Sequence, residues 1–198
     1  MLFEVIQIIA DQVNSYLEES GLTKSVIPEN IAFIESQVED PQSLTNNVYI
    51  TLLNIQEENT LKNFPNKSIE DSKVVYKNHI LNLNLYILFA ANRDTYLKSL
   101  KDISKIIEFF QGKKLFTQSN TIFDRNKPSM SNIENFKFSV ELYTPTFEEM
   151  NFIWGTLGGK QYPSALYKVS MIQIERDIPQ VEGSIIHEID GNTNQILN

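Results

Sequence analysis

Apolar residues at the start of the chain recur with the spacing of an α-helix. Their side chains fall on one side of a helical wheel, while Glu4, Gln7 and Asp11 fall on the other. The apolar positions are Leu2, Val5, Ile6, Ile9, Val13, Tyr16 and Leu17. This pattern predicts an amphipathic helix over residues 2–19, which ends before Gly21.

The middle of the chain changes to the alternation that is typical of a β-strand. Over residues 80–91, one side of the strand would carry Leu81, Leu83, Leu85, Ile87 and Phe89, and the other Asn82, Asn84 and Tyr86. Side chains two positions apart share a face of a sheet. The segment therefore predicts a half-buried strand with one apolar and one polar face.

Two more helices are expected after this strand. Asn92 is expected to cap the second helix and Gly112 to end it. Its core stripe would comprise Tyr96, Leu97, Leu100, Ile103, Ile107 and Phe110. Thr146 and Glu149 match a capping box, so a third helix is predicted to begin there and to stop at Gly158 and Gly159.

The other segments complete a mixed pattern of strands and loops. Further strands are predicted at 30–35, 48–55, 114–117, 136–143 and 166–174, a turn at 40–47, and long loops at 58–73 and 119–135. Because strands mostly adjoin strands, the order indicates an α+β domain rather than an alternating α/β one. We expect one domain over residues 1–176 and an extended tail over 177–198.

Composition excludes several classes of function. The 198 residues contain no cysteine and carry a formal net charge of −8. The charge disfavours a nucleic-acid binder, which needs a basic face, and docking on anionic membranes. Residues 1–10 lack the features of a targeting segment, and no apolar run reaches the length of about 20 residues that spans a bilayer. A soluble protein that folds in the cytoplasm is expected.

The candidate motifs for catalysis, cofactor binding and metal binding each lack a residue or a spacing that the chemistry requires. Residues 155–160 suggest a phosphate-binding loop, but a helix is expected to end there, whereas a phosphate cradle needs one to begin. His79 and His187 lack ligand-spaced partners, and residues 190–194 lack the glycine and the glutamate of a calcium loop. The adjacent pairs Glu57–Glu58 and Glu148–Glu149 do not converge on one point. No enzyme is predicted.

Four residues are candidates for an interface. Trp154 lies on the apolar stripe of the third helix, where a core position is expected and an exposed aromatic anchor is the alternative. Asn82, Asn84 and Tyr86 form the polar face of the alternating strand, for which plain exposure to solvent is an equal alternative.

Several segments, taken in order, are similar to a known family. They are LLNIQEENTLKN at 52–63, YKN at 76–78 with LNLY at 83–86, FFQGK at 109–113, FEEMN at 147–151 with Trp154, PSALYKV at 163–169, and residues 189–190 in the tail. Over about residues 3–190 the chain resembles the tail-terminator, or cap, proteins of extracellular contractile injection systems, in particular their N-terminal domain. These phage-tail-like particles are typified by the antifeeding prophage and the Photorhabdus virulence cassettes.

The resemblance implies an α+β domain with a mixed, mostly antiparallel sheet packed by about three helices, as in phage tail terminators. It also implies a homohexameric ring that binds the far end of the inner tube and the last sheath ring and so stops polymerisation. Such a ring needs a head-to-tail surface that closes on itself. Its partners would be itself, the tube protein and the sheath protein, without nucleic acid, cofactor or membrane insertion. It would assemble in the cytoplasm and then form part of the extracellular particle.

Two hypotheses concern the contacts, and two alternatives concern the function. An exposed strand edge would accept an extended arm of the sheath by strand addition, and loops 58–73 and 119–135 would contact the tube or a neighbour. Another structural part of the same particle, such as a sheath or baseplate adaptor, would form open polymers or asymmetric assemblies. A small-molecule or lipid-binding α+β domain would instead be a monomer with an apolar cavity.

Overall fold

The computed structural model describes residues 2–34, 46–58, 67–70, 73–76, 80–122, 136–174 and 181–184. In chain order the elements are α1 (Leu2–Glu19), β1 (Val26–Pro28), the 3-10 helix η1 (Ile31–Phe33), β2 (Asn47–Glu57), β3 (Lys67–Glu70), β4 (Lys73–Tyr76), β5 (Leu81–Asn92), α2 (Tyr96–Gly112), β6 (Leu115–Thr117), β7 (Lys137–Tyr143), α3 (Phe147–Thr156), β8 (Ser164–Ile174) and β9 (Val181–Ser184).

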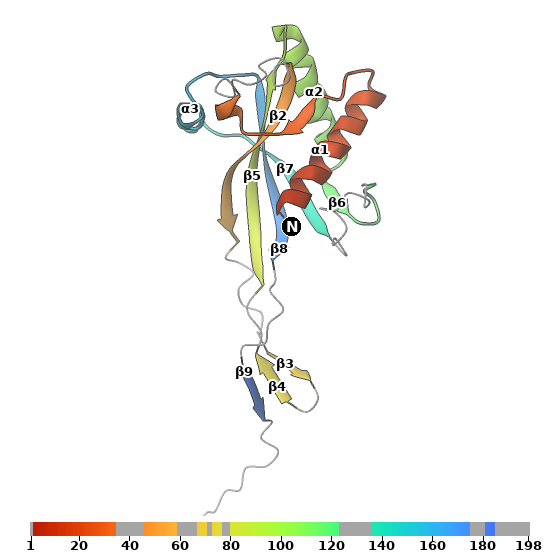
Figure 1. The fold of residues 1–198 in the computed structure, drawn as a ribbon, viewed down its shortest axis with the longest axis vertical. Helices are drawn as coiled ribbons and strands as arrows, with labels where there is room; N and C mark the ends of the chain where they lie inside the picture. Colours follow the sequence, from red (N-terminus) through yellow and green to blue (C-terminus); the bar gives the residue numbers. More distant parts are fainter. Residues whose placement is uncertain are drawn as a thin grey trace, which may run out of the picture.

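Six strands pair into one mixed sheet in the order β1-β2-β5-β8-β7-β6 (Figure 1). β1 runs parallel to β2, and every other neighbouring pair in this sheet is antiparallel. The predicted fold class is therefore confirmed: an α+β domain with a mostly antiparallel sheet and, in the part of the chain that the structure describes, three α-helices. The predicted helix over 2–19 is also confirmed, with the bounds of α1.

The sheet is covered on both faces. α1 and α2 pack on one face, where the side chains of Ile87 and Phe89 from β5 belong to the larger core cluster. η1 and α3 lie on the other face, where Leu88 and Ala90 belong to a second cluster (Figure 1). β5 lies between β2 and β8, and from Ile87 to Ala91 it is buried on both sides rather than half-buried as predicted, whereas Leu81 at its start is exposed.

Two predicted elements are wrong. The strand at 30–35 is instead η1 over residues 31–33, because the Asn30 side chain accepts a hydrogen bond from the Ala32 N–H and caps a helical turn. The loop at 58–73 contains β3, and β4 begins at its end. The partner of β4 is β9, more than 100 residues further on, so local patterns could not reveal this pairing.

The second helix begins three residues later than predicted. Asn92 remains in β5 opposite Asn47, and the cap is Thr95, whose hydroxyl oxygen accepts a hydrogen bond from the Lys98 N–H. The core stripe is also partly wrong, since Ile103 and Phe110 are buried but Tyr96, Leu97, Leu100 and Ile107 are exposed. The buried residues of α2 are Ser99, Asp102, Ile103, Ile106, Phe109 and Phe110.

A buried ion pair explains how α2 is rotated on the sheet. Nε of Arg93, just after β5, lies 2.9 Å from Oδ2 of Asp102, and the two side chains are 9% and 2% exposed. The guanidinium also donates hydrogen bonds to Oγ1 of Thr23 at 2.8 Å and to the backbone oxygen of Asn46. A buried charge requires partners, so this pair turns the Asp102 side of α2 inward.

A second, three-stranded sheet has the order β3-β4-β9. It lies beyond the far ends of β5 and β8 (Figure 1). β9 falls within the segment 177–198 that was expected to be an extended tail, so part of that segment is paired with β4. The domain boundary at residue 176 stays a prediction. The turn at 40–47 and the loop at 119–135 lie mostly outside the described residues.

Candidate functional site

The outer edge of β2 is open along half of its length. β1 pairs only with Val48 to Ile50, and the chain then continues across this edge through Glu29, whose N–H donates to the Ile50 oxygen at 3.2 Å. The Thr51 hydroxyl donates to the Glu29 oxygen and accepts from the Ile31 N–H. From Leu52 to Glu57, β2 pairs with β5 on its inner side, and no described strand pairs with its outer side.

A bulge marks the point where this open edge begins. Leu52 pairs with Ile87 and Asn54 with Tyr86, so Leu53 is one residue extra on β2. A bulge bends the strand and increases its twist, and it is common at sheet edges. Beyond it Asn54, Ile55 and Gln56 are all exposed. Among the described residues, no strand pairs with the outer side of Leu52 to Gln56, so this part of the edge can accept another chain.

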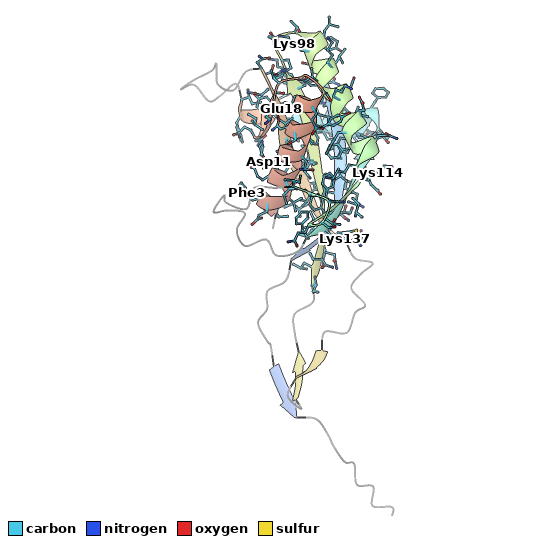
Figure 2. All side chains as sticks on the ribbon, turned by 90° about the vertical axis from the view of Figure 1, so that its right-hand side faces the viewer. Phe3, Asp11, Glu18, Lys98, Lys114 and Lys137 are labelled. Carbon is cyan, nitrogen blue, oxygen red and sulfur yellow. The ribbon has the colours of Figure 1, made fainter. Side chains whose placement is uncertain are left out.

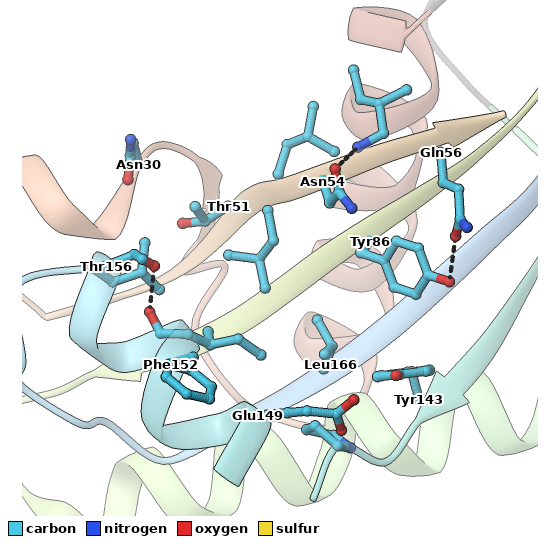
Figure 3. A pocket seen from close by; sticks show the side chains of 16 residues that line it. Asn30, Thr51, Asn54, Gln56, Tyr86, Tyr143, Glu149, Phe152, Thr156 and Leu166 are labelled. Atoms are coloured by element: carbon cyan, nitrogen blue, oxygen red, sulfur yellow. Dashed lines mark hydrogen bonds between the residues drawn. The ribbon is translucent and has the colours of Figure 1, made fainter.

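A groove of about 680 Å³ lies beside the open edge, between the sheet and α3. Figure 3 shows its walls: residues from β2 on one side, Tyr86 and Leu166 of the sheet beneath, and Glu149, Phe152 and Thr156 of α3 opposite. We call this the α3 groove, and its lining consists of Asn30, Thr51–Gln56, Tyr86, Tyr143, Pro145, Glu149, Phe152, Ile153, Thr156, Leu157 and Leu166. Eight of the sixteen lining residues are polar, so the groove combines apolar side chains with hydrogen-bonding groups that could orient a ligand.

Local sequence fixes the wall that α3 provides. Its predicted capping box is confirmed: Oγ1 of Thr146 accepts from the Glu149 N–H at 3.2 Å, and a Glu149 carboxylate oxygen accepts from the Thr146 N–H at 2.8 Å. Trp154 is 4% exposed and belongs to the second core cluster, with its ring 6.0 Å from that of Tyr162. Trp154 therefore occupies the predicted core position and anchors α3 to the sheet.

The polar face that was predicted on the central strand is divided between two environments. Tyr86 lies in the α3 groove, where its hydroxyl donates to Oε1 of Gln56 at 3.1 Å and its ring packs edge-on against Tyr143. Asn82 and Asn84 are buried, and the Asn84 amide donates to a Glu58 carboxylate oxygen at 2.9 Å. Plain exposure to solvent, the alternative that the sequence left open, is wrong for these two residues, which are 8% and 3% exposed. An interface role of the four candidates stays a prediction.

The phosphate-loop interpretation finds no geometric support. α3 ends at Thr156, and Gly158 and Gly159 follow with positive φ values of 99° and 78°. The Gly159 N–H donates to the Trp154 oxygen at 2.7 Å, as in a glycine-terminated helix. These N–H groups face the end of a helix, so they do not form a cradle for an anion.

Titratable groups are sparse in and around the groove. Glu149 and the two tyrosines are its titratable lining residues, and Glu149 already caps α3. Among the described residues, no three His, Cys, Asp or Glu side chains gather as a metal site would require. His79, His187 and residues 190–194 lie outside the described residues. None of the described helices is long and apolar enough to cross a membrane.

The arrangement suits the binding of an extended polypeptide. An open edge offers backbone N–H and C=O groups, and the groove beside it offers apolar walls for alternate side chains. An exposed strand edge was predicted without its location, and the lining residues Leu53, Ile153 and Leu157 were not among the candidates. The apolar side of the third helix was the available signal, but nothing local showed which strand it would face.

The fold and the groove define the class of the protein: an α+β domain with helices on both faces of a mixed sheet and a candidate binding site for another polypeptide. A family model described as the Pvc16 N-terminal domain matches residues 4–188, and the chain belongs to this family. No curated protein matches the sequence.

Two solved structures have a similar fold. One is the PVC sheath/tube terminator of an extracellular contractile injection system in its extended state, with a TM-score of 0.62 and 11% identity. The alignment covers 100% of this chain and 64% of that one. The other is the anti-feeding prophage cap, a tube-terminating cap, with a TM-score of 0.60 and 12% identity over 98% of this chain and 62% of that one. The chain thus spans less than two thirds of either structure, and the family resemblance is confirmed.

Proposed function

We propose that this chain acts as a tail terminator of a contractile injection system. It would form a homohexameric ring on the end of the inner tube, contact the last sheath ring and block the addition of further subunits. The observation that carries this proposal is the family match over residues 4–188, and the shared fold with two terminators of such particles supports it. The role is structural, and catalysis has no place in it.

The proposal assigns a task to the open edge of β2. An extended arm of a sheath subunit would add as a strand along residues 52–57, with alternate side chains entering the α3 groove. The backbone groups of an added strand would complete the hydrogen bonding of the edge, and Phe152 and Ile153 would cover its apolar side chains. The added strand would join cap and sheath through backbone hydrogen bonds to β2, so the cap would need no additional helix or strand.

The mass of the purified chain in solution tests the ring. We expect light scattering at two concentrations and two salt concentrations to give about six chains, and negative stain to show closed rings. If the chain is monomeric by itself, co-sedimentation with assembled tubes decides, since a ring can close on its template. A chain that neither forms rings nor sediments with tubes contradicts the proposal.

The contact with the sheath has its own test. Replacing Phe152 in the groove wall or Ile55 on the open edge with serine should release the sheath from capped tubes, and the mass of the ring should not change. Ile122→Ser is the matched control, because Ile122 is an exposed apolar residue outside the groove. Equal loss of sheath in all three variants would contradict strand addition at this edge.

The groove also supports a second function, the binding of a small apolar ligand. Its volume of about 680 Å³ lies within the usual range for such sites of about 300–1,000 Å³. A monomeric chain whose melting temperature rises on addition of short-chain lipids would favour this function over the terminator.

A further inference from the structure

α2 presents apolar side chains to solvent as well as to the core. Tyr96, Leu97, Leu100 and Ile107 lie on one flank of the helix, and Leu97 is 71% exposed. Spacings of three and seven residues place Leu97, Leu100 and Ile107 on one side of the helix. We call these four residues the α2 stripe. A row of this kind on a helix whose other flank is already buried marks an interaction surface.

A hollow of about 420 Å³ continues the α2 stripe at its C-terminal end. It lies between α2 and β7, and its rim includes Ile107, Gln111, Lys114 and Leu142. Its floor is apolar, since Phe110, Val140 and Tyr167 are buried core residues that also line it. The hollow therefore offers space for an apolar side chain from another molecule.

The N-terminal end of α3 is the counterpart of this surface. Phe147, the first residue of α3, is 98% exposed. Glu148 lies beside Phe147 and makes no ion pair with any described residue. α3 and α2 cover opposite faces of the sheet, so the two surfaces lie on different sides of the molecule (Figure 1).

The two surfaces also differ in charge. Around the α2 stripe and the hollow, four lysines (Lys98, Lys101, Lys105 and Lys114) are present with three carboxylates (Asp94, Glu108 and Glu141), although the whole chain carries −8. Lys98 and Lys105 form ion pairs with Asp94 and Glu108, whereas Lys101 and Lys114 have no ion pair among the described residues. α3 carries two glutamates and no basic residue.

We propose that α3 of one copy of the chain packs onto the α2 stripe of the next copy, with Phe147 in the hollow and Glu148 near Lys114. This inference rests on the proposed ring and names the surfaces that build it. Because the two surfaces differ and lie on different sides, the contact is head-to-tail, and successive copies generate a ring when the rotation between them closes. Opposite charges would set the orientation of each copy.

Substitution of exposed apolar residues tests the contact without disturbing the core. Phe147→Ser and Leu142→Ser should each raise the protein concentration at which rings form by at least about tenfold, since truncation of a central aromatic or apolar anchor has effects of this size. The matched control is Phe3→Ser: Phe3 is 57% exposed and lies on α1 (Figure 2), which contributes no residue to either surface. Circular dichroism should show that all three variants are folded. Unchanged ring formation by Phe147→Ser contradicts the contact.

Cross-linking tests the same contact directly, because the chain has no cysteine of its own. A variant with Lys114→Cys and Glu148→Cys should give a ladder of linked chains that ends at the size of the ring, whether rings form in solution or on assembled tubes. Glu18→Cys with Glu148→Cys is the control pair and should remain unlinked. Rings without cross-links contradict only the contact between α3 and α2, whereas a chain that forms no rings in either setting contradicts both this contact and the terminator proposal.

Discussion

Replacement of Asp102 by alanine leaves the guanidinium of Arg93 buried without its counter-ion. Arg93 connects four parts of the fold: it follows β5, pairs with Asp102 of α2 at 2.9 Å, and donates to Thr23 after α1 and to Asn46 before β2. Thr23 and Asn46 are neutral acceptors, so they cannot replace the lost carboxylate. Asp102→Ala should therefore destabilise the region where both large helices meet the sheet.

The expected loss is large for a domain of this size. Removal of one partner of a buried ion pair costs about 3–5 kcal/mol, because the other charge stays buried and uncompensated. We expect about 3 kcal/mol here, near the lower end of that range, since Arg93 keeps its two neutral acceptors. The total free energy of unfolding of such domains is about 5–15 kcal/mol.

Urea denaturation followed by tryptophan fluorescence measures this loss. Trp154 is the single tryptophan and is buried, so its emission should shift to longer wavelength on unfolding. Lys98→Ala is the control on the same helix, because Lys98 and Asp94 form an exposed ion pair, and its removal should change the stability little.

A double variant separates loss of charge compensation from loss of packing. Arg93→Met combined with Asp102→Leu removes both charges and should recover most of the stability that Asp102→Ala loses, as in other proteins whose buried pairs were replaced by apolar residues. A loss below about 1 kcal/mol in Asp102→Ala, the size of an exposed pair, would refute the reasoning. A double variant no more stable than Asp102→Ala would also refute it.

Three further predictions follow from the same structure. Burial raises the pKa of Asp102, although Arg93 opposes this, so the native state retains a proton that the unfolded chain releases near pH 4. Protonated Asp102 should therefore stabilise the native state fully below that pH, and this stabilisation should be lost as the pH rises through the higher native pKa. The free energy of unfolding of Asp102→Asn, measured by urea titration at several pH values, should lack this pH dependence. The same pH profile in the variant and the unsubstituted protein would contradict the prediction. Trp154→Ala should cost about 3–5 kcal/mol by circular dichroism, whereas Phe147→Ala should change stability by less than about 0.5 kcal/mol. Similar losses in both would show that Trp154 does not anchor α3. Thr146→Ala should cost about 1 kcal/mol through loss of the cap, and Thr146→Ser should recover most of it; no recovery would exclude the hydroxyl as the cause.

Features that depend on neighbouring residues could be predicted from the sequence. Helical spacing of apolar residues gave the bounds of α1, and Thr146 with Glu149 gave the start of α3, because a capping box is complete within four residues. The cap of α2 was placed at Asn92 instead of Thr95. Both residues are good caps, and only the pairing of Asn92 with Asn47 keeps it in β5.

Features that depend on distant partners could not be predicted. The candidate site is open because β1 pairs with only three residues of β2, and it has walls because α3 returns to the same face of the sheet. Its lining comes from segments up to 136 positions apart, from Asn30 to Leu166. No pattern within one of these segments contains information about the others.

The α+β class, most of the helices and strands, and the family resemblance could be predicted without coordinates, since they follow from periodicity, capping and collinear similarity. Which faces of these elements are covered depends on tertiary packing. Asn82 and Asn84 are polar and yet buried in the central strand, whereas Leu97 and Leu100 are apolar and yet exposed, because the flank of α2 with Asp102, Ile106 and Phe110 faces the sheet. Burial is a property of the neighbours that folding brings to a residue, so hydrophobicity alone does not fix it.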